Sequence, residues 1–458
     1  MSALGGQAVQ QEAVLPTAAG RETARLLSPT LLLCIAGLLL PNALSIGAMI
    51  SGIGLPPRTT AIILYAMVAL SVRYLAAVPV AVLFVVVAIY DGISTIALQF
   101  GLAPSEIGLA LHLANELDLF KSPLYAALIV GVISFAGLCI FMLTRFRAAL
   151  RNGSTGISLA AVLLFVGADF TGNTSAHYQF GALYGANAPM QSAAVSSGFR
   201  DTVLTGKPKR VLVVIVEALG KFADPLKQEA LLKPFRNPEL QKRYRVTNGS
   251  TTYFGSTTAG EMRELCDTRA SYSKVASLTG EHCLPQLMRE RGYKTEALHH
   301  FTKSFFDRAE WYPKIGFQEY AFREDLKPKK RRKCGGPFRA PCDVEMLPRI
   351  TRAFQEAKEP LFYYWLTLST HVPVMLSDAT PQLDCANRGG AFGHKEVCGM
   401  AELWMDVFDG IIDMTAQIGP TEILLVGDHS PPLWSRAGRA LFEPGKVTWV
   451  RLSPRGAE

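Results

Sequence analysis

Residues Val211–Gly220 read VLVVIVEALG, an unbroken apolar run that ends in the carboxylate of Glu217 and then in small residues. A basic segment, Lys207-Pro208-Lys209-Arg210, precedes the run. Continuous β-branched and leucyl residues are typical of a strand buried on both faces of a parallel sheet. Glu217 would then lie at the carboxyl end of the strand, at the edge where open α/β sheets bind their ligands.

A second run of the same kind, Ile423–Gly427, is followed directly by Asp428 and His429. Two carboxylates and an imidazole at strand ends are suitable ligands for a divalent metal ion. Polar residues at strand ends are common in α/β domains, so one such strand would predict little. Two of them, with a threonine-rich loop between them in the sequence, favour a metal site.

Residues 205–458 alternate charged and apolar segments, as soluble domains do. We expect strands at 211–217, 293–298, 361–368, 422–427 and 446–452, and helices near 258–276, 282–291 and 400–416. Such alternation predicts an α/β/α domain, a mostly parallel sheet with helices on both faces.

Residues 29–172 consist instead of long apolar runs with few charges, which predicts a transmembrane domain. We expect a bundle of five spanning helices at about 29–50, 59–73, 75–97, 123–144 and 156–172, most of them near the roughly twenty residues that a bilayer requires. Residues 1–28 are expected to be a disordered cytoplasmic tail, and not a signal peptide. Residues 173–204 are either an interfacial linker helix or a plain linker.

Orientation follows from the basic residues of the short loops, which favour the cytoplasmic side. The cytoplasmic ends would carry Arg21, Arg25, Arg73, Arg145, Arg147 and Arg151. The more acidic loop 98–122 would lie outside, and an odd number of spans would place 205–458 outside as well. The prediction is an integral, multi-pass protein of a bacterial inner membrane with its catalytic domain in the periplasm.

The cysteines agree with this topology. Six of the eight lie in the soluble half: Cys266, Cys283, Cys334, Cys342, Cys385 and Cys398. Three close-spaced pairs indicate disulfides and an oxidising compartment. A zinc site is the alternative, but no pair has the short Cys-x-x-Cys spacing. Pairing of neighbours is one of about fifteen connectivities that six cysteines allow.

The net charge of +8 does not indicate a nucleic-acid partner, because much of it lies in membrane-flanking arginines and in the loop Lys327–Lys333. Phospholipid head groups or an anionic glycan are the expected partners of such charges. A solvated surface run is the simpler interpretation of the loop.

The loop Gly255–Glu261 (GSTTAGE) leads into a helical pattern. A hydroxyl at a helix start is often only a cap. The functional interpretation is a nucleophile, since the free NH groups and the helix dipole attract an anionic substrate. The pattern alone does not choose between Thr257 and Thr258.

The order of strand-Glu, Thr at a helix start, His371-Val372-Pro373 and strand-Gly-Asp-His resembles the alkaline phosphatase/sulfatase superfamily. In particular it is similar to the membrane-anchored phospholipid head-group transferases: lipoteichoic acid synthases, phosphoethanolamine transferases and periplasmic-glucan phosphoglycerol transferases. Residues 284–295 and 304–308 are similar to segments of the lipoteichoic acid synthase branch. That branch has an acid four residues after its nucleophile, as Glu261 follows Thr257.

The resemblance implies roles for individual residues. Thr257 is the nucleophile and Thr258 the reserve nucleophile, otherwise a substrate contact. His371 binds the phosphoryl group or protonates the leaving oxygen. Arg308 binds phosphate, and of the adjacent His299 and His300 we favour His299. One divalent metal ion, Zn or Mn, is held by Glu217, Thr257, Asp428 and His429.

The implied reaction is transfer of a phosphoethanolamine or phosphoglycerol head group from a membrane phospholipid donor to an envelope glycan or lipid acceptor, through a phosphothreonine. A sulfatase-like hydrolase is the nearest rival, although Cys283-Leu284-Pro285-Gln286-Leu287 lacks the Arg of the sulfatase motif Cys/Ser-x-Pro-x-Arg. A non-catalytic scaffold for glycan export is the third hypothesis.

Overall fold

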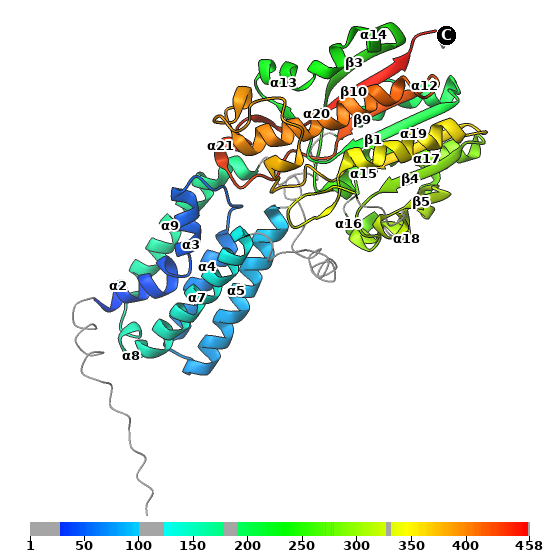
Figure 1. The fold of residues 1–458 in the computed structure, drawn as a ribbon. Coiled ribbons are helices and arrows are strands. Elements are labelled where there is room, and N and C mark those ends of the chain that lie inside the picture. The colour runs from blue at the N-terminus through cyan, green and yellow to red at the C-terminus, as the bar shows by residue number, and fades with distance from the viewer. Residues whose placement is uncertain are drawn as a thin grey trace, which may run out of the picture. The chain divides into compact units, whose positions relative to one another are not determined.

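The computed structural model describes residues 28–99, 123–177, 190–270, 272–275, 277, 279–326 and 331–456 (Figure 1). Contacts divide the chain into two units. The first contains the described parts of Met1–Leu44, Arg58–Tyr90 and Val132–Asp169, and the second those of Ser45–Pro57, Asp91–Gly131 and Phe170–Glu458. Most of the predicted tail 1–28, of the loop 98–122 and part of the linker 173–204 lie outside the described residues.

Helices occupy all five of the predicted apolar segments. They are α2 (Pro29–Cys34), a π-helical turn (Ile35–Leu39) and α3 (Ala43–Ile50), then α4 (Thr59–Ser71), α5 (Ala77–Gln99), α7 (Pro123–Arg145), α8 (Arg147–Leu150) and α9 (Thr155–His177). Among the described residues only Ala77–Gln99 and Ala126–Arg145 are long and apolar enough to cross a membrane alone.

The first predicted span is broken, because its two halves are bent by 68°. If that pair is one span, the described residues hold three candidates. The segments Thr59–Ser71 and Thr155–Thr171 are apolar but shorter. The apolar character of 29–172 is therefore confirmed, while the count of five spans is not established.

The second unit is built on a mixed, mostly parallel sheet with the strand order β2-β10-β9-β1-β8-β4-β5, and β3 also pairs with β10. The strands are β1 (Arg210–Val216), β2 (Gly220–Phe222), β3 (Tyr244–Thr252), β4 (Lys294–His299), β5 (Glu319–Ala321), β8 (Leu361–Leu366), β9 (Glu422–Gly427) and β10 (Phe442–Pro454). Strands β9, β1, β8, β4 and β5 are parallel, and β10 is antiparallel to its partners.

Strand β1 is buried on both faces, as its continuous apolar sequence predicts. Leu212, Val214 and Val216 join one core with α13 (Pro225–Leu231), α14 (Pro238–Arg243), α19 (Leu347–Glu356) and α20 (Lys395–Thr415). Val211, Val213 and Ile215 join the other with α11 (Ala193–Ser196), α12 (Phe199–Thr205), α15 (Thr257–Cys266) and α17 (Leu284–Glu290). The predicted three-layer α/β/α arrangement is confirmed (Figure 1).

Short elements complete the second unit. They are α16 (Tyr272–Val275), α18 (Arg308–Trp311), α21 (Arg436–Arg439), the ribbon of β6 (Lys333–Cys334) and β7 (Ala340–Pro341), and 3₁₀ turns at Lys233–Arg236, Gly280–His282, Phe305–Asp307, Pro313–Ile315, Arg323–Asp325, Asp343–Met346, Leu376–Asp378 and Gly390–Phe392. The helix predicted at 258–276 ends earlier, because Asp267 adopts a left-handed conformation (φ +48°) that closes α15 after Cys266.

Candidate metal and phosphoryl-transfer site

Sheet register brings the two predicted metal-binding segments together. In the parallel pair β1 and β9, Val216 lies opposite Gly427. The next residues, Glu217 and Asp428, therefore leave the sheet side by side. The apolar runs predict that Glu217 and Asp428 each lie at the end of a strand. Because β1 and β9 are neighbours in the sheet, the two carboxylates form one cluster.

The side chains of Glu217, Asp428 and His429 each offer a ligand atom, and these atoms lie within 4.8 Å of one another. His429 Nε2 lies 3.4 Å from Asp428 Oδ2 and 3.6 Å from Glu217 Oε1. All three residues are buried. Two carboxylates and an imidazole at this spacing suit a divalent cation.

Two oxygens of the cluster have no protein donor. Glu217 Oε1 and Asp428 Oδ2 are buried and find no hydrogen-bond partner among the described residues. Asp428 Oδ1, in contrast, accepts hydrogen bonds from the backbone NH groups of Ala218 and His429, both at 2.8 Å. Burial, and after it the negative charge of Asp428, raise the pKa of Glu217 well above its ordinary value. A cation would bind the two oxygens that lack donors and would offset the repulsion between the two buried carboxylates. These side chains therefore suit a metal ion.

His429 is oriented for the same purpose. Its Nδ1 lies 3.0 Å from the carbonyl oxygen of Ser430, which is a proton acceptor and so keeps the proton on Nδ1. Nε2 then faces the carboxylates with its lone pair. Such an outer hydrogen bond fixes the tautomer that ligates a metal.

The structure distinguishes the two candidate nucleophiles. Thr257 is the first residue of α15, and its Oγ1 lies 3.3 Å from His429 Nε2 and 3.4 Å from Glu217 Oε2. The hydroxyl of Thr258 is fully buried and lies 3.1 Å from that of Ser256. Of the two, Thr257 is thus the residue that the fold brings to the carboxylate cluster.

A glycine allows α15 to approach the cluster. A Cβ atom at Gly260 would lie 2.7 Å from both Cα and Cβ of Asp428, closer than side chains tolerate. Any larger residue would push the helix away from the end of β9, and the Thr257 hydroxyl with it. Gly260 therefore permits the close packing of α15 against the end of β9.

A buried ion pair, Arg263 with Glu264, also holds α15 against the end of β9. The sequence pattern did not indicate this pair. Arg263 donates to the carbonyl oxygens of Asp428 at 3.1 Å and Gly427 at 2.6 Å, and pairs with Glu264 at 2.5 Å. Glu264 accepts from the backbone NH groups of Ala193 and Ala194 at 3.1 and 2.8 Å. Apart from the Arg263–Glu264 pair itself, the partners of this network are distant in the sequence, so a charged helix pattern alone would indicate a solvated face.

Arg308 is occupied by a second buried carboxylate. Its Nε and Nη2 both donate to Glu261 Oε2, at 3.0 and 2.8 Å, and Nη1 donates to the carbonyl of Phe305. The other oxygen of Glu261 accepts from the hydroxyls of Tyr312 and Tyr364, both at 2.8 Å. Burial disfavours the charged guanidinium, but the charge of Glu261 outweighs it and the pKa of Arg308 is raised.

The two adjacent histidines have different surroundings. His299 ends β4, with Nδ1 3.3 Å from the carbonyl of Leu366. Burial, and then the charge of Arg308, lower the pKa of His299 well below its usual range. His300 is fully buried, and its Nε2 lies 2.9 Å from Asp343 Oδ1. The prediction that His299 contacts substrate stays a prediction.

His371 follows β8 at the same edge of the sheet. Its Nδ1 lies 3.0 Å from the carbonyl of Val372, and its ring lies against Phe338 with a centroid distance of 3.6 Å. Burial lowers the pKa of His371 to about 4, and the charges of His429 and Asp428 also act on it. The imidazole is therefore neutral at neutral pH.

The disulfides follow the neighbour pairing considered above. Cys266 bonds to Cys283, Cys334 to Cys342 and Cys385 to Cys398. Cys34 and Cys139 are free. Cys283, the cysteine of the sulfatase-like Cys-x-Pro sequence, is thus engaged in a covalent bond.

The sequence model of the Sulfatase family matches residues 209–391, the segment that contains β1, Thr257 and His371. Residues 209–391 thus resemble a sulfatase-family domain, which agrees with the predicted resemblance to the alkaline phosphatase/sulfatase superfamily. Asp428 and His429 lie beyond the matched segment and complete the cluster from β9.

A curated relative from Rhizobium meliloti (strain 1021), a putative cyclic beta-1,2-glucan modification protein, is 24% identical over 289 residues. The match covers 56% of this chain but only 43% of that protein, so the chain matches less than half the relative's length.

Three solved structures resemble part of this chain at low sequence identity. The lipoteichoic acid synthase LtaP from Listeria monocytogenes is 16% identical (TM-score 0.39; 53% of this chain, 65% of that one). The Streptococcus pyogenes phosphoglycerol transferase GacH is 15% identical (0.39; 58% and 76%). The C-terminal periplasmic domain of EcEptC from Escherichia coli, in a complex with Zn, is 12% identical (0.36; 55% and 74%).

Proposed function

We propose that this protein transfers a phosphoethanolamine or phosphoglycerol head group from a membrane phospholipid to a cell-envelope glycan or lipid. The observation that carries the proposal is the position of the Thr257 hydroxyl. Thr257 begins a helix, and its hydroxyl lies beside the carboxylate of Glu217 and the imidazole of His429. Glu217 and the adjacent Asp428 are buried, and each has one oxygen that finds no donor among the described residues. A hydroxyl nucleophile, a cation site and a helix N-terminus are the components that transfer of a phosphoryl group requires.

In the first half-reaction, Thr257 Oγ1 forms a bond to phosphorus and the bond from phosphorus to the diacylglycerol oxygen breaks. The proton that Thr257 loses ends on the diacylglycerol. In the second half, the oxygen of an acceptor hydroxyl bonds to phosphorus, the Thr257 ester bond breaks, and the acceptor's proton restores the threonine. His371, neutral because burial lowers its pKa to about 4, is the group we assign to these proton transfers.

Glu217, Thr257, Asp428 and His429 would hold one divalent metal ion, Zn or Mn. When bound, the ion would neutralise the two carboxylates, lower the pKa of the Thr257 hydroxyl and offset charge that develops on phosphorus. Both metals accept this mixture of oxygen and nitrogen ligands.

Arg308, His299 and Thr258 are proposed substrate contacts. The guanidinium of Arg308 already carries hydrogen bonds to Glu261 and Phe305, so a phosphate there would share it with Glu261. His299 has a buried Nε2 with no hydrogen-bond partner among the described residues, which supports a substrate contact at that atom.

We further propose that 29–172 is a five-span transmembrane domain and that 205–458 is periplasmic, with 173–204 as the link. The apolar helices support membrane anchoring, and three disulfides support an oxidising compartment. This topology would give the site access to phospholipid of the outer leaflet. The relative described as a glucan modification protein supports a glycan as the acceptor.

A sulfatase-like ester hydrolase is the second candidate, because the family match favours it. In such an enzyme water would take the place of the acceptor hydroxyl. The bonded state of Cys283 speaks against a nucleophile made from that cysteine. A non-catalytic scaffold would have no need for the metal ligands, so an empty site in purified protein would favour that reading.

The test is intact-mass analysis of the full-length, metal-loaded protein after incubation with phosphatidylethanolamine or phosphatidylglycerol vesicles. Wild type is compared with Thr257→Ala and with Thr258→Ala, which removes the neighbouring hydroxyl. We expect an adduct on wild type, a smaller amount of the same adduct on Thr258→Ala and none on Thr257→Ala, and the mass of the adduct identifies the head group. No adduct from either lipid would contradict the transferase proposal.

A further inference from the structure

The loop that carries His371 is held from two sides. On the side of the metal ligands, the Thr367 hydroxyl accepts from the backbone NH of Glu217 at 2.9 Å, and the Thr370 hydroxyl donates to the Glu217 carbonyl at 2.6 Å. These bonds fix the loop to the end of β1. They leave the backbone of Leu368 and Ser369 to be held by another element.

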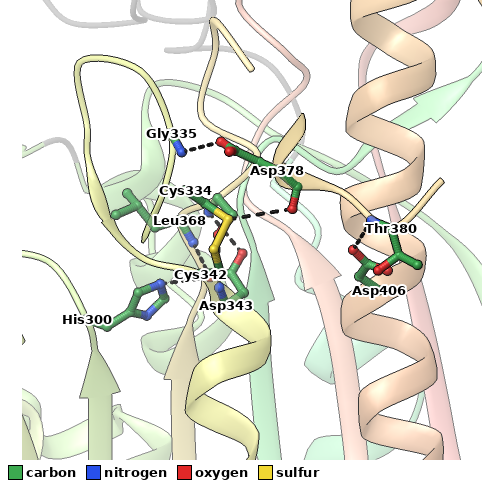
Figure 2. Close-up of a disulfide and its surroundings, with 10 residues drawn as sticks. His300, Cys334, Gly335, Cys342, Asp343, Leu368, Asp378, Thr380 and Asp406 are labelled. Atoms are coloured by element: carbon green, nitrogen blue, oxygen red, sulfur yellow. Dashed lines mark hydrogen bonds and ion pairs between the residues drawn. A yellow bond between two sulfur atoms is a disulfide. The ribbon is translucent and has the colours of Figure 1, made fainter. Parts of the chain in front are cut away.

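Asp343 holds that second side. Its Oδ1 accepts from the backbone NH of Leu368 and its Oδ2 from that of Ser369, both at 2.9 Å. Its own backbone NH donates in return to the Ser369 hydroxyl at 2.9 Å. Asp343 is only 3% exposed, so these bonds are sheltered from water. Figure 2 shows the carboxylate between the loop and His300, whose Nε2 lies 2.9 Å away.

Asp343 directly follows a disulfide. Cys342 bonds to Cys334 and closes a hairpin whose two strands, β6 and β7, are two residues long each (Figure 2). Such a short ladder is not stable by itself, so the covalent bond is what keeps the hairpin closed. Asp378 also ties it down, because Oδ2 accepts from the backbone NH of Gly335 at 2.8 Å.

The same hairpin contacts the imidazole itself. Phe338, between the two cysteines, packs against the His371 ring with centroids 3.6 Å apart. The rings of Phe301 and Phe305 also pack against Phe338, at centroid distances of 6.1 and 5.7 Å. One disulfide-closed segment thus fixes His371 twice, at its backbone through Asp343 and at its ring through Phe338.

We propose that Asp343 is a positioning residue for His371, and that the Cys334–Cys342 disulfide keeps Asp343 and Phe338 in place, so that removal of this disulfide lowers the activity of the site. The inference rests on the proposed catalytic role of His371. Among the described residues, Asp343 has no hydrogen bond or ion pair to Glu217, Asp428 or His429, although its negative charge contributes to the raised pKa of Glu217. We assign its effect on the reaction to the loop 367–371, which its hydrogen bonds hold.

The test uses the full-length protein and two readouts. Hydrogen exchange reports the amides of Leu368 and Ser369, and hydrolysis of bis(4-nitrophenyl) phosphate reports turnover of a phosphodiester without assuming a lipid donor. In Asp343→Asn we expect at least one of the two amides to exchange about tenfold faster, because one of the two acceptor oxygens becomes an NH₂ donor. We expect kcat to fall by about 10- to 100-fold with KM within about twofold and metal content unchanged.

Two further variants separate positioning from general damage. Cys334→Ala/Cys342→Ala should reproduce the loss of kcat, whereas Cys385→Ala/Cys398→Ala, which removes a disulfide of similar loop length, should not. In His371→Gln the additional change Asp343→Asn should have no further effect on kcat, since the group that it positions is gone.

Unchanged exchange of Leu368 and Ser369 in Asp343→Asn would overturn the inference, whatever the activity. So would faster exchange with an unchanged kcat, or equal loss of activity from the two disulfide variants. If wild type does not turn over the diester, the exchange result decides alone. Failure of the lipid adduct experiment would reject the transferase proposal and leave this test intact.

Discussion

Glu217 and Glu261 are both buried carboxylates close to the start of α15, but their surroundings differ. Both oxygens of Glu261 are engaged by protein donors, namely Arg308, Tyr312 and Tyr364. Glu217 lies beside a second carboxylate, Asp428, and each of the two has an oxygen with no donor among the described residues. The protein neutralises Glu261 with its own donors, whereas Glu217 and Asp428 would need an external cation.

A buried carboxylate that lacks protein donors is a better indication of a functional site than one that is fully paired. A fully paired carboxylate such as Glu261 contributes to the stability of the fold. Its removal leaves the charge of Arg308 buried without a counter-ion, which lowers the free energy of unfolding. An incompletely satisfied pair such as Glu217 and Asp428 is unfavourable in the protein alone, and a function must account for it. The experiments below either sharpen this contrast or remove it.

The largest effect is expected on activity in Glu217→Gln and Asp428→Asn. Each change removes a charge that holds the cation, and loss of several kcal/mol of transition-state stabilisation corresponds to about a thousandfold in rate. Turnover of a phosphodiester measures it. Glu443→Gln, which breaks only a surface pair with Lys446, is the control and should retain activity. A loss below about tenfold in both site variants would remove the contrast.

The next effect is on stability, in Glu261→Ala. This change leaves Arg308 buried without its counter-ion, and breaking such a pair costs about 3–5 kcal/mol. Denaturant unfolding measures the loss. By contrast, Glu217→Gln should leave the stability of metal-free protein unchanged or higher, because it removes one of two adjacent buried negative charges. If both variants lose the same stability, the two carboxylates do not differ in the way described.

Removal of the metal should lower the thermal stability that depends on the Glu217–Asp428 site and should leave the Glu261–Arg308 pair unaffected. A ligand present at about a hundred times its Kd stabilises the folded state by about 2.7 kcal/mol, so a chelator should lower the Tm of wild type. The Tm of Asp428→Asn should not respond to the chelator. An equal response of the two proteins would show that any bound metal lies elsewhere.

The smallest effect concerns the pH dependence of the metal-free protein. Burial and Asp428 raise the pKa of Glu217 in the folded state, so between its ordinary value and the raised one the folded protein binds a proton that the unfolded chain releases. Stability should therefore fall as pH rises through that range, by up to about 1.4 kcal/mol per pH unit. Glu217→Gln should lack this slope, and a wild type without it would contradict the raised pKa.

Much of this site could be predicted from the sequence, because its parts are local. The runs before Glu217 and Asp428 are apolar enough to be recognised as buried strands, and parallel strands that end in carboxylates bring them to one edge. The cysteine pairs are close in the chain, so neighbour pairing agrees with the structure.

The remaining features depend on contacts that the sequence does not show. Glu261, Arg263 and Glu264 form a charged pattern typical of a solvated helix face, yet all three are buried, since their partners come from residues 193–194, 308–312, 364 and 427–428. Asp343 likewise has no local signal, because its partners are Leu368 and Ser369. Distant partners of this kind are found only when the fold is known.

The most direct test of the account is the metal content of the purified full-length protein, measured by elemental mass spectrometry for wild type, Asp428→Asn and Thr258→Ala. We expect about one equivalent of Zn or Mn in wild type and in Thr258→Ala, and almost none in Asp428→Asn. Wild type that binds no metal on reconstitution, or Asp428→Asn that retains a full equivalent, would contradict it.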